Sequence, residues 1–244
     1  MEIRDKDQVQ IGVDTGGTFT DLVCISKNRP IRIVKVPSTP DDPSQAIIEG
    51  LNKLKCKWEL SADSISKFCH GTTVATNSLI QRKGGQVGVL ATEGFEDVLE
   101  IGRQMRQQLY ETILRPQTPI FLAPGRRRKG IKERIASNGI VLTEINEKTV
   151  LDAAKELVDD GVEAIAICFL FSFLNPVHEL RARDIILSNF PSIHVSISSE
   201  VDPTFREYER TIVTAFDAYL KPVVDKYLIL PISCNQECSG PIPG

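Results

Sequence analysis

The stretch best suited to bind an anion covers residues 11–21 and reads IGVDTGGTFTD. Gly16 and Gly17 carry no Cβ, so the backbone can turn sharply there and approach a ligand closely. Backbone N–H groups in such a turn can converge on an anion. Asp14 precedes the turn and is placed to hold a hydrated Mg²⁺ that bridges phosphates. Hydroxyl donors at the same turn come from Thr15, Thr18 and Thr20.

The glycine pair also has a simpler explanation. An apolar run at 9–13 and an alternating run at 19–25 predict two strands, which the glycines would join as a β-hairpin. Gly-Gly by itself is typical of such a hairpin turn. The carboxylate of Asp14, two glycines and three hydroxyl groups within seven residues favour a phosphate site over a plain turn.

A second cluster of polar residues lies at 70–79, which read HGTTVATNSL. A short strand over 65–69 is expected to end at Gly71, and a helix is expected to begin just beyond it. The start of a helix presents free backbone N–H groups to a ligand, and Thr72 and Thr73 add hydroxyl groups there. The pattern predicts a second ligand-binding element at this strand–helix junction.

The polar residues of this junction have alternative roles. Thr72, Thr73 and Asn77 lie on the side of the predicted helix opposite its apolar residues, where they could contact a ligand or cap the helix. His70 could be a catalytic or a structural histidine.

The composition is that of an ordinary globular protein and argues against two kinds of partner. The chain has 244 residues, 41% of them hydrophobic and 25% charged, with a formal net charge of −3, so no overall basic field favours nucleic acid. No apolar run approaches the roughly 20 residues of a transmembrane helix, so no membrane partner is expected. The N-terminal residues MEIRDKDQVQ lack the apolar core of a signal peptide, and we expect a cytoplasmic protein.

Six cysteines are scattered along the chain. Cys24, Cys69 and Cys168 lie in apolar, strand-like runs, where a buried reduced thiol is the usual state. A chain of this length without a secretory signal needs no disulfide framework. Cys234 and Cys238 could hold a metal ion, but a single C-x₃-C pair is a weak signal for one.

Hydrophobic periodicity predicts the elements that position these residues. Strands are expected over 9–13, 19–26, 31–36, 65–69, 87–91, 162–171 and 193–198, and helices over about 43–55, 72–83, 92–99, 146–160 and 176–190. A hairpin is expected over 131–142, across an Asn-Gly turn. A final long helix should follow 200–203 and kink or end at Pro222. Alternating helices and strands after residue 146 predict an α/β sheet.

The motifs resemble those of a known family. D-x-G-G-T at a turn between two strands resembles the first phosphate motif of the actin, hexokinase and heat-shock chaperone superfamily of ATPases. The longer string GVDTGGTFTD over 12–21 is similar to the N-terminal region of the hydantoinase/oxoprolinase family, as are HGTTVATN over 70–77 and EVDPTFREYERT over 200–211. That family includes ATP-dependent N-methylhydantoinase, 5-oxoprolinase and a subunit of acetone-type carboxylases.

The resemblance implies a fold and an activity. The fold would be α/β, the first lobe of an actin-like (ribonuclease H-like) ATPase with a mixed sheet flanked by helices. ATP would phosphorylate a carbonyl oxygen of a cyclic amide or ketone substrate and so activate it for hydrolysis or carboxylation. Asp14 would bind Mg²⁺ and act with His70 and Thr72 in catalysis. Contacts to ATP would come from Thr15, Gly16, Gly17, Thr18, Thr20, Gly71, Thr73 and Asn77.

A third string, IGRQ over 101–104, also resembles the family pattern. Arg103 is therefore a candidate to bind the anionic part of the substrate or a phosphate. Arg106 could do the same, although a surface role suits it better. Gln107 departs from the pattern, which has proline at this point, and this puts the local loop conformation in doubt.

The likeness extends over residues 9–227, and we expect one domain over 1–229 that can accommodate an inserted subregion at about 100–145, then a flexible tail over 230–244. No second D-x-G phosphate motif follows residue 200, so a second lobe or a partner subunit is expected to complete the enzyme. The alternative is a non-catalytic lobe that binds a partner chain.

Other nucleotide-binding families fit the sequence less well. A sugar-kinase-like protein shares the glycine turn but not HGTTVATN, and neither a P-loop nor a dinucleotide G-x-G-x-x-G motif is present. The motifs do not distinguish hydantoin, oxoproline and ketone substrates.

Overall fold

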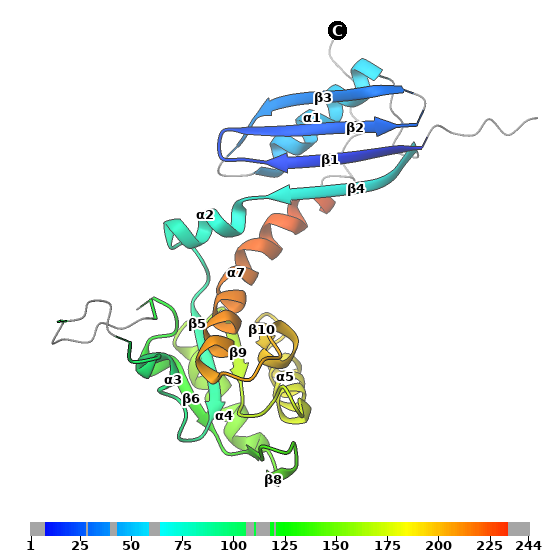
Figure 1. Cartoon of the computed structure of the whole chain (residues 1–244). Coiled ribbons are helices and arrows are strands. Elements are labelled where there is room, and N and C mark those ends of the chain that lie inside the picture. Colours follow the sequence, from blue (N-terminus) through cyan, green and yellow to red (C-terminus); the bar gives the residue numbers. More distant parts are fainter. Residues whose placement is uncertain are drawn as a thin grey trace, which may run out of the picture. The chain divides into compact units, whose positions relative to one another are not determined.

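The computed structural model describes residues 8–27, 29–39, 43–58, 64–105, 110, 118–119 and 121–233 (Figure 1). The chain forms two compact units. Unit 1 comprises residues 1–77 and 223–244, and unit 2 comprises residues 78–222. The boundaries fall inside two helices, α2 (Val74–Gln81) and α7 (Glu207–Ser233).

Unit 1 is built on a four-stranded mixed sheet with the order β3-β2-β1-β4. Its strands are β1 (Val9–Thr15), β2 (Phe19–Ser26), β3 (Arg29–Pro37) and β4 (Ile65–Thr72). The first three are antiparallel neighbours, which confirms the predicted hairpin of β1 and β2, whereas β4 runs parallel to β1. The helix α1 (Pro43–Trp58) covers one face of this sheet (Figure 1). The polar motifs at 11–21 and 70–79 therefore begin on adjacent strands.

The core of unit 1 follows from the alternation of apolar side chains along the strands. Val9, Ile11 and Val13 of β1 are buried in one cluster with Ile47 and Leu54 of α1. The opposite face of the sheet carries the polar positions of β1, among them Asp14, because successive side chains point to opposite faces. The packing of α1 on one face leaves the other face for the candidate site.

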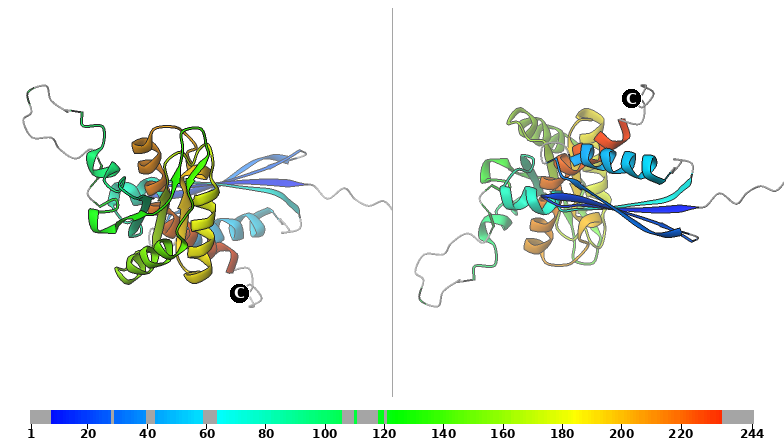
Figure 2. Two further views of the ribbon diagram at one scale, coloured as in Figure 1. Left: turned by 90° about the horizontal axis from the view of Figure 1, so that it is seen from below. Right: turned by 90° about the horizontal axis from the view of Figure 1, so that it is seen from above.

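Unit 2 is built on a parallel sheet with the order β10-β9-β5-β6 (Figure 2). Its strands are β5 (Val87–Thr92), β6 (Arg128–Ile131), β9 (Ala164–Cys168) and β10 (His194–Ile197). All residues of β5 and β9 are buried. Ile165 and Ile167 pack with α4 (Glu147–Asp159) and α5 (Val177–Asn189), whereas Ala164 and Ala166 pack with α7. Helices thus cover both faces, as expected for a continuous apolar strand.

Shorter elements complete unit 2. They are α3 (Val98–Ile101), a 3₁₀ turn η2 (Gly125–Arg127), the hairpin strands β7 (Arg134–Ile135) and β8 (Val141–Thr143), and α6 (Ser198–Val201). The hairpin turn has Gly139 at a φ of +81°, the conformation that an Asn-Gly turn supplies at low cost. Asn146 caps α4, because its side chain accepts a hydrogen bond from the backbone N–H of Thr149 at 3.2 Å.

The last long helix differs most from the prediction. The helix was predicted to kink or end at Pro222, but α7 begins at Glu207 and continues past Pro222 to Ser233, so it does not end there. Local packing explains the difference: the Pro222 ring lies against Gly85, whose N–H donates to the carbonyl of Tyr219 at 2.9 Å. Residues 230–233 continue α7, and the rest of the predicted tail, with Cys234 and Cys238, lies outside the described residues.

Two of the three cysteines expected to be buried are buried. Cys24 and Cys168 are buried free thiols, and burial raises the pKa of the Cys168 thiol to about 12. Cys69 is exposed instead, because β4 is an edge strand of its sheet in the described part of the chain. Among the described residues, no helix has both the length and the apolar character that a membrane span requires.

Candidate phosphate-binding site

The turn between β1 and β2 is held by a residue that lies after β3. The N–H of Gly16 donates to the carbonyl of Phe19 at 3.0 Å, which closes the turn. Ser38 then donates from its hydroxyl to the carbonyl of Gly16 at 2.7 Å and from its N–H to the carbonyl of Thr18 at 2.9 Å. A Cβ at Gly17 would meet no atom within 4 Å. The turn is therefore fixed from one side and open at Gly17.

The three threonines of the turn have different environments. Thr18 is exposed, whereas Thr15 and Thr20 are buried. The Thr20 hydroxyl lies 3.0 Å from the Ser38 hydroxyl, so it supports the turn from the core side. Only Thr18 of the three is exposed to a ligand in the structure.

Asp14 is exposed at the end of β1, next to two other strands of the sheet. It lies opposite Asp21 of β2 and beside Gly71 of β4 in the strand register. A Cβ added to Gly71 would lie 3.6 Å from Asp14 Oδ1, which shows that the carboxylate lies over this glycine. Asp21 forms an ion pair with Lys35 at 3.4 Å. Two carboxylates thus share one edge of the open sheet face.

This arrangement fits Mg²⁺ only in part. The described residues contain no group of three or more His, Cys, Asp or Glu side chains that could hold a metal ion. Mg²⁺ in phosphate sites is usually bound by one or two carboxylates, and water and phosphate oxygens complete its coordination. Asp14 meets that requirement, provided that phosphate supplies the other ligands.

His70 is held at the same end of the sheet by two hydroxyl groups. Its Nε2 lies 3.1 Å from Thr15 Oγ1 and 2.6 Å from Tyr227 Oη. The Tyr227 side chain comes from α7, is buried, and has its ring centroid 5.3 Å from that of His70. Burial lowers the pKa of His70, and the Asp14 charge opposes this shift only in part. His70 is therefore neutral at pH 7.

The β4–α2 junction is joined to the end of β1. Thr73 donates to the carbonyl of Thr15 from both its N–H and its hydroxyl, each at 3.4 Å. The Asn77 side-chain amide donates to the Thr73 hydroxyl at 3.2 Å, and the Thr72 hydroxyl accepts from the N–H of Val74, also at 3.2 Å. Thr72 thus caps the helix. The contacts bring the two sequence motifs together in unit 1.

The sequence analysis did not identify Ser38 and Tyr227 as site residues, and it predicted Arg103, which belongs to unit 2. Ser38 and Tyr227 carry no motif of their own, and only the folded chain places them against Gly16 and His70. Arg103 lies in unit 2, where its guanidinium forms an ion pair with Glu209. Arg106 and Gln107 lie outside the described residues.

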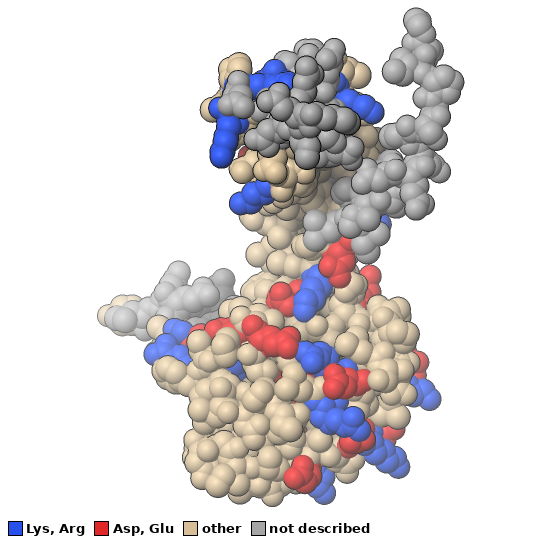
Figure 3. Space-filling view, turned by 90° about the vertical axis from the view of Figure 1, so that its right-hand side faces the viewer, with Lys and Arg blue, Asp and Glu red and all other residues tan. Residues whose placement is uncertain are grey.

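Charged side chains of both signs lie on the face shown in Figure 3. Over unit 2, Lys and Arg are interspersed with Asp and Glu, whereas over unit 1 most of the charged side chains in view are Lys and Arg. The basic run at 126–129 is paired with acidic residues: Arg128, Lys129 and Arg126 form ion pairs with Glu100, Glu156 and Asp160, respectively. The basic run is therefore neutralised within the fold.

The α/β fold brings together a glycine turn, a carboxylate at the end of β1 and a threonine-rich junction, and this combination is the candidate site of the chain. The sequence places it in a particular family. The chain matches the family described as "Hydantoinase/oxoprolinase N-terminal region" over residues 10–190, and we conclude that it belongs to this family. The family resemblance predicted from the motifs is thereby confirmed.

Two curated relatives illustrate the family. The chain is 36% identical to the caprolactamase subunit alpha of Pseudomonas jessenii, over 91% of this chain and 33% of the relative. It is also 36% identical to the acetophenone carboxylase gamma subunit of Aromatoleum aromaticum, over 86% of this chain and 31% of the relative. The chain therefore spans about a third of the length of these relatives, both of which are named as subunits.

Two solved structures share the fold. A nucleotide-free acetone carboxylase, from work on ATP-dependent acetone carboxylation, matches with a TM-score of 0.79 and 27% identity, over 95% of this chain and 35% of that chain. The ATP-dependent caprolactamase of Pseudomonas jessenii matches with a TM-score of 0.79 and 33% identity, over 96% and 34%. The predicted fold class, the first lobe of an actin-like ATPase with mixed sheets flanked by helices, is confirmed.

Proposed function

We propose that unit 1 binds the phosphates of ATP and Mg²⁺ as part of an enzyme that phosphorylates a substrate carbonyl. The product of that step would be an activated cyclic amide, ready for hydrolysis, or an activated ketone, ready for carboxylation. The main support is that Asp14, the open turn at Gly17 and the β4–α2 junction lie together in unit 1. Both solved relatives are described as ATP-dependent.

Each part of the site has a physical task in this proposal. Catalysis of phosphoryl transfer depends on positioning and on charge stabilisation, and Mg²⁺ neutralises part of the phosphate charge. Asp14 would hold that ion, and the backbone N–H groups of Gly17 and Thr18 in the open turn would be available to bind the phosphates. His70, neutral and fixed through Nε2, can accept or donate a proton at its other ring nitrogen.

A second part of the enzyme is needed to complete such a site. Phosphates are held from more than one side in transfer enzymes, and the two curated relatives are about three times as long as the matched region. We therefore propose that a second lobe or a partner subunit contributes the remaining contacts to the nucleotide and to the cyclic amide or ketone. The part described here should bind nucleotide weakly by itself.

Replacing Asp14 in the complete enzyme tests the proposal. We expect Asp14→Asn to lower ATP turnover by at least about 100-fold, since one transition-state charge interaction is typically worth that much. Asp152→Asn, a change of the same kind at an exposed position of α4, is the matched control and should leave turnover unchanged. Normal turnover by the Asp14 variant would exclude this role for Asp14.

The alternative is a non-catalytic lobe that binds a partner chain. It is favoured by the names of the two curated relatives, both of which are subunits of larger enzymes. The two proposals differ in one observable: substrate-dependent ATP hydrolysis by an assembly that contains this chain supports the enzyme, whereas an equally active assembly with the Asp14→Asn variant supports the non-catalytic lobe.

A further inference from the structure

A groove in unit 2 lies at the position where open parallel sheets bind ligands. The strand β5 pairs with β6 on one side and with β9 on the other. The chain passes from β5 to β6 and then crosses to β9, so the sheet order reverses between β5 and β9. Ligands of such sheets bind outside the carboxyl ends of the strands at this reversal. The groove is lined by residues that follow β5 and β9 directly, including Phe95, Val98, Leu170 and Phe171.

The size and lining of this β5/β9 groove suit a small amphipathic molecule. Its volume is about 490 Å³, within the roughly 300–1,000 Å³ of small-molecule sites. Most of its lining is apolar and comes from Phe95, Val98, Ile101, Leu170 and Phe171. Polar groups come from Arg134, Glu207 and Tyr208. A ligand with an apolar body and a polar end would match both parts.

Among the residues that the structure describes, the charged groups lining the groove have no ion-pair partner. The Arg134 guanidinium lies 5.2 Å from the centroid of the Phe95 ring. In the described part of the chain, neither Arg134 nor Glu207 forms an ion pair. A cation and a carboxylate that line the same groove without pairing are available to a ligand that carries both charges.

A small cavity next to the groove is also lined by both an arginine and glutamates. It has a volume of about 10 Å³ and shares Phe95, Val98, Leu170 and Glu207 with the groove. Its lining adds Arg210 and Glu96. Arg210 is 1% exposed, and its Nε has no hydrogen-bond partner among the described residues. Such an unpaired buried donor is costly, and a ligand oxygen in the cavity, which has room for about one water-sized group, would satisfy it.

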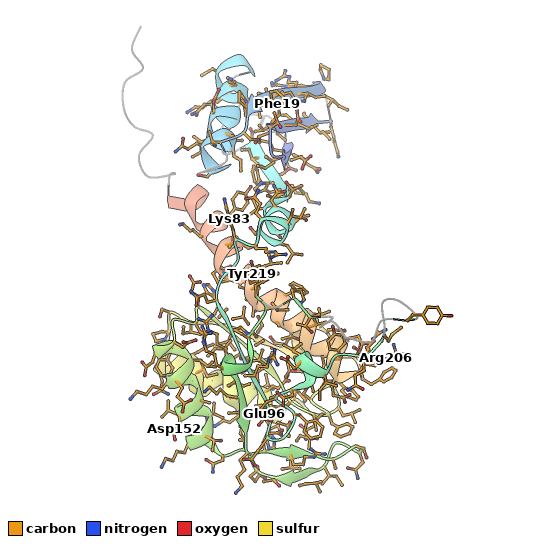
Figure 4. The ribbon with its side chains drawn as sticks, turned by 90° about the vertical axis from the view of Figure 1, so that its left-hand side faces the viewer. Phe19, Lys83, Glu96, Asp152, Arg206 and Tyr219 are labelled. Carbon is orange, nitrogen blue, oxygen red and sulfur yellow. The ribbon has the colours of Figure 1, made fainter. Side chains whose placement is uncertain are left out.

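The backbone around the groove is strained at two positions. Phe171, which lines the groove, has a φ of +56°, and Arg206, directly before Glu207 at the start of α7 (Figure 4), has a φ of +55°. Side chains other than glycine rarely adopt this conformation. Strain of this kind is retained mainly at functional sites.

We propose that the β5/β9 groove binds a zwitterionic apolar amino acid. The two guanidinium groups and two carboxylates that line the groove and the cavity give no net charge, which matches a zwitterion. Arg134 would bind the carboxylate of the ligand, Glu207 its ammonium group, and the apolar walls its side chain. All of these residues lie in unit 2, so the proposal does not depend on the phosphate site in unit 1.

Calorimetric titration of the full chain with L-leucine tests this proposal. Two analogues with the same apolar side chain test each charged group of leucine by itself. 4-Methylpentanoate keeps only the carboxylate, and 3-methylbutylamine keeps only the ammonium group. We expect saturable binding of leucine and at least about tenfold weaker binding of each analogue, since a hydrogen-bonded charge contributes about that much.

Two variants assign the recognition to the groove. Arg134→Gln should weaken leucine binding about tenfold or more and abolish the preference for leucine over 3-methylbutylamine. Glu207→Gln should abolish the preference for leucine over 4-methylpentanoate. Arg126→Gln and Glu156→Gln, at exposed positions of the same unit, are the matched controls and should bind leucine as the original chain does.

Three results would overturn the proposal. The first is that leucine does not bind the correctly folded full chain at millimolar concentration. The second is that leucine and its two analogues bind equally well. The third is that leucine binding is unchanged in both groove variants, which would place the ligand elsewhere.

Discussion

At the scale of single residues, the protonation state of His70 is set by its surroundings. The ring nitrogen Nε2 lies between the hydroxyl groups of Thr15 and Tyr227, and burial lowers the pKa of the imidazole below its ordinary value of 6.5. A histidine kept neutral at pH 7 can exchange a proton with a substrate or a leaving group. This is the property that the proposed phosphoryl-transfer site requires of it.

The lowered pKa of His70 predicts a pH dependence of stability. Above pH 7 the ring is neutral in both the folded and the unfolded chain, and its contribution to stability is complete. As the pH falls through 6.5, the unfolded chain binds the proton first, so the free energy of unfolding decreases until the pH is below the folded-state pKa. Thermal unfolding at several pH values should show this loss in the original chain and a smaller loss in His70→Gln. Identical pH profiles would contradict the assignment.

Ser38 and Tyr227 show why part of the site could not be predicted from the sequence. The glycine turn and the threonine-rich junction are local patterns whose residue types indicate their chemistry. Ser38 contacts Gly16 across 22 residues of sequence, and Tyr227 contacts His70 across 157. Such pairs depend on how the strands and α7 pack, and neither residue type marks them in advance.

At the scale of elements, the sheet of unit 1 depends on the close approach of α1. A Cβ at Gly50 would lie only 2.2 Å from Leu22 Cδ1, so glycine allows the helix to lie against β2. Helix periodicity predicted α1 over about 43–55, and the observed helix covers 43–58. Periodicity does not report the distance between helix and sheet, so the requirement for glycine became apparent only from the structure.

The contact at Gly50 can be tested by one substitution. Gly50→Ala should lower the free energy of unfolding by about 1–3 kcal/mol, since an added methyl group in a packed core forces shifts of this cost. Gly12→Ala is the matched control, because a Cβ at Gly12 would meet no atom within 4 Å. Urea denaturation measures both. If the two variants unfold at the same urea concentration, the tight packing of α1 on β2 is not present in solution.

The other differences between prediction and structure occur at the end of strand β9 and in the edge strand β4. The apolar run over 162–171 forms a strand only over 164–168, because the segment turns at the carboxyl end of the sheet, where Phe171 adopts a positive φ. Cys69 follows the apolar pattern of β4 yet is exposed, since β4 has a neighbour on one side only among the described strands. Local hydrophobicity does not distinguish an edge strand from a central one.

At the scale of the whole molecule, the two units carry two separate candidate sites. Unit 1 contains the candidate phosphate site, and unit 2 contains the β5/β9 groove. The chain corresponds to about a third of its curated relatives. A nucleotide affinity measured on this chain alone should therefore be lower than the affinity of an assembly that completes the site.

Calorimetric titration with Mg·ATP tests the central claim most directly. It should be carried out on the full chain, alone and with any partner that co-purifies with it, and repeated for Asp14→Asn. Because Asp14 is exposed, the substitution should change the free energy of unfolding by no more than about 0.5 kcal/mol. We predict weak binding by the chain alone, tighter binding with a partner, and loss of both in the variant. Equal binding by the folded Asp14 variant, or no binding with or without a partner, would contradict the phosphate-site assignment.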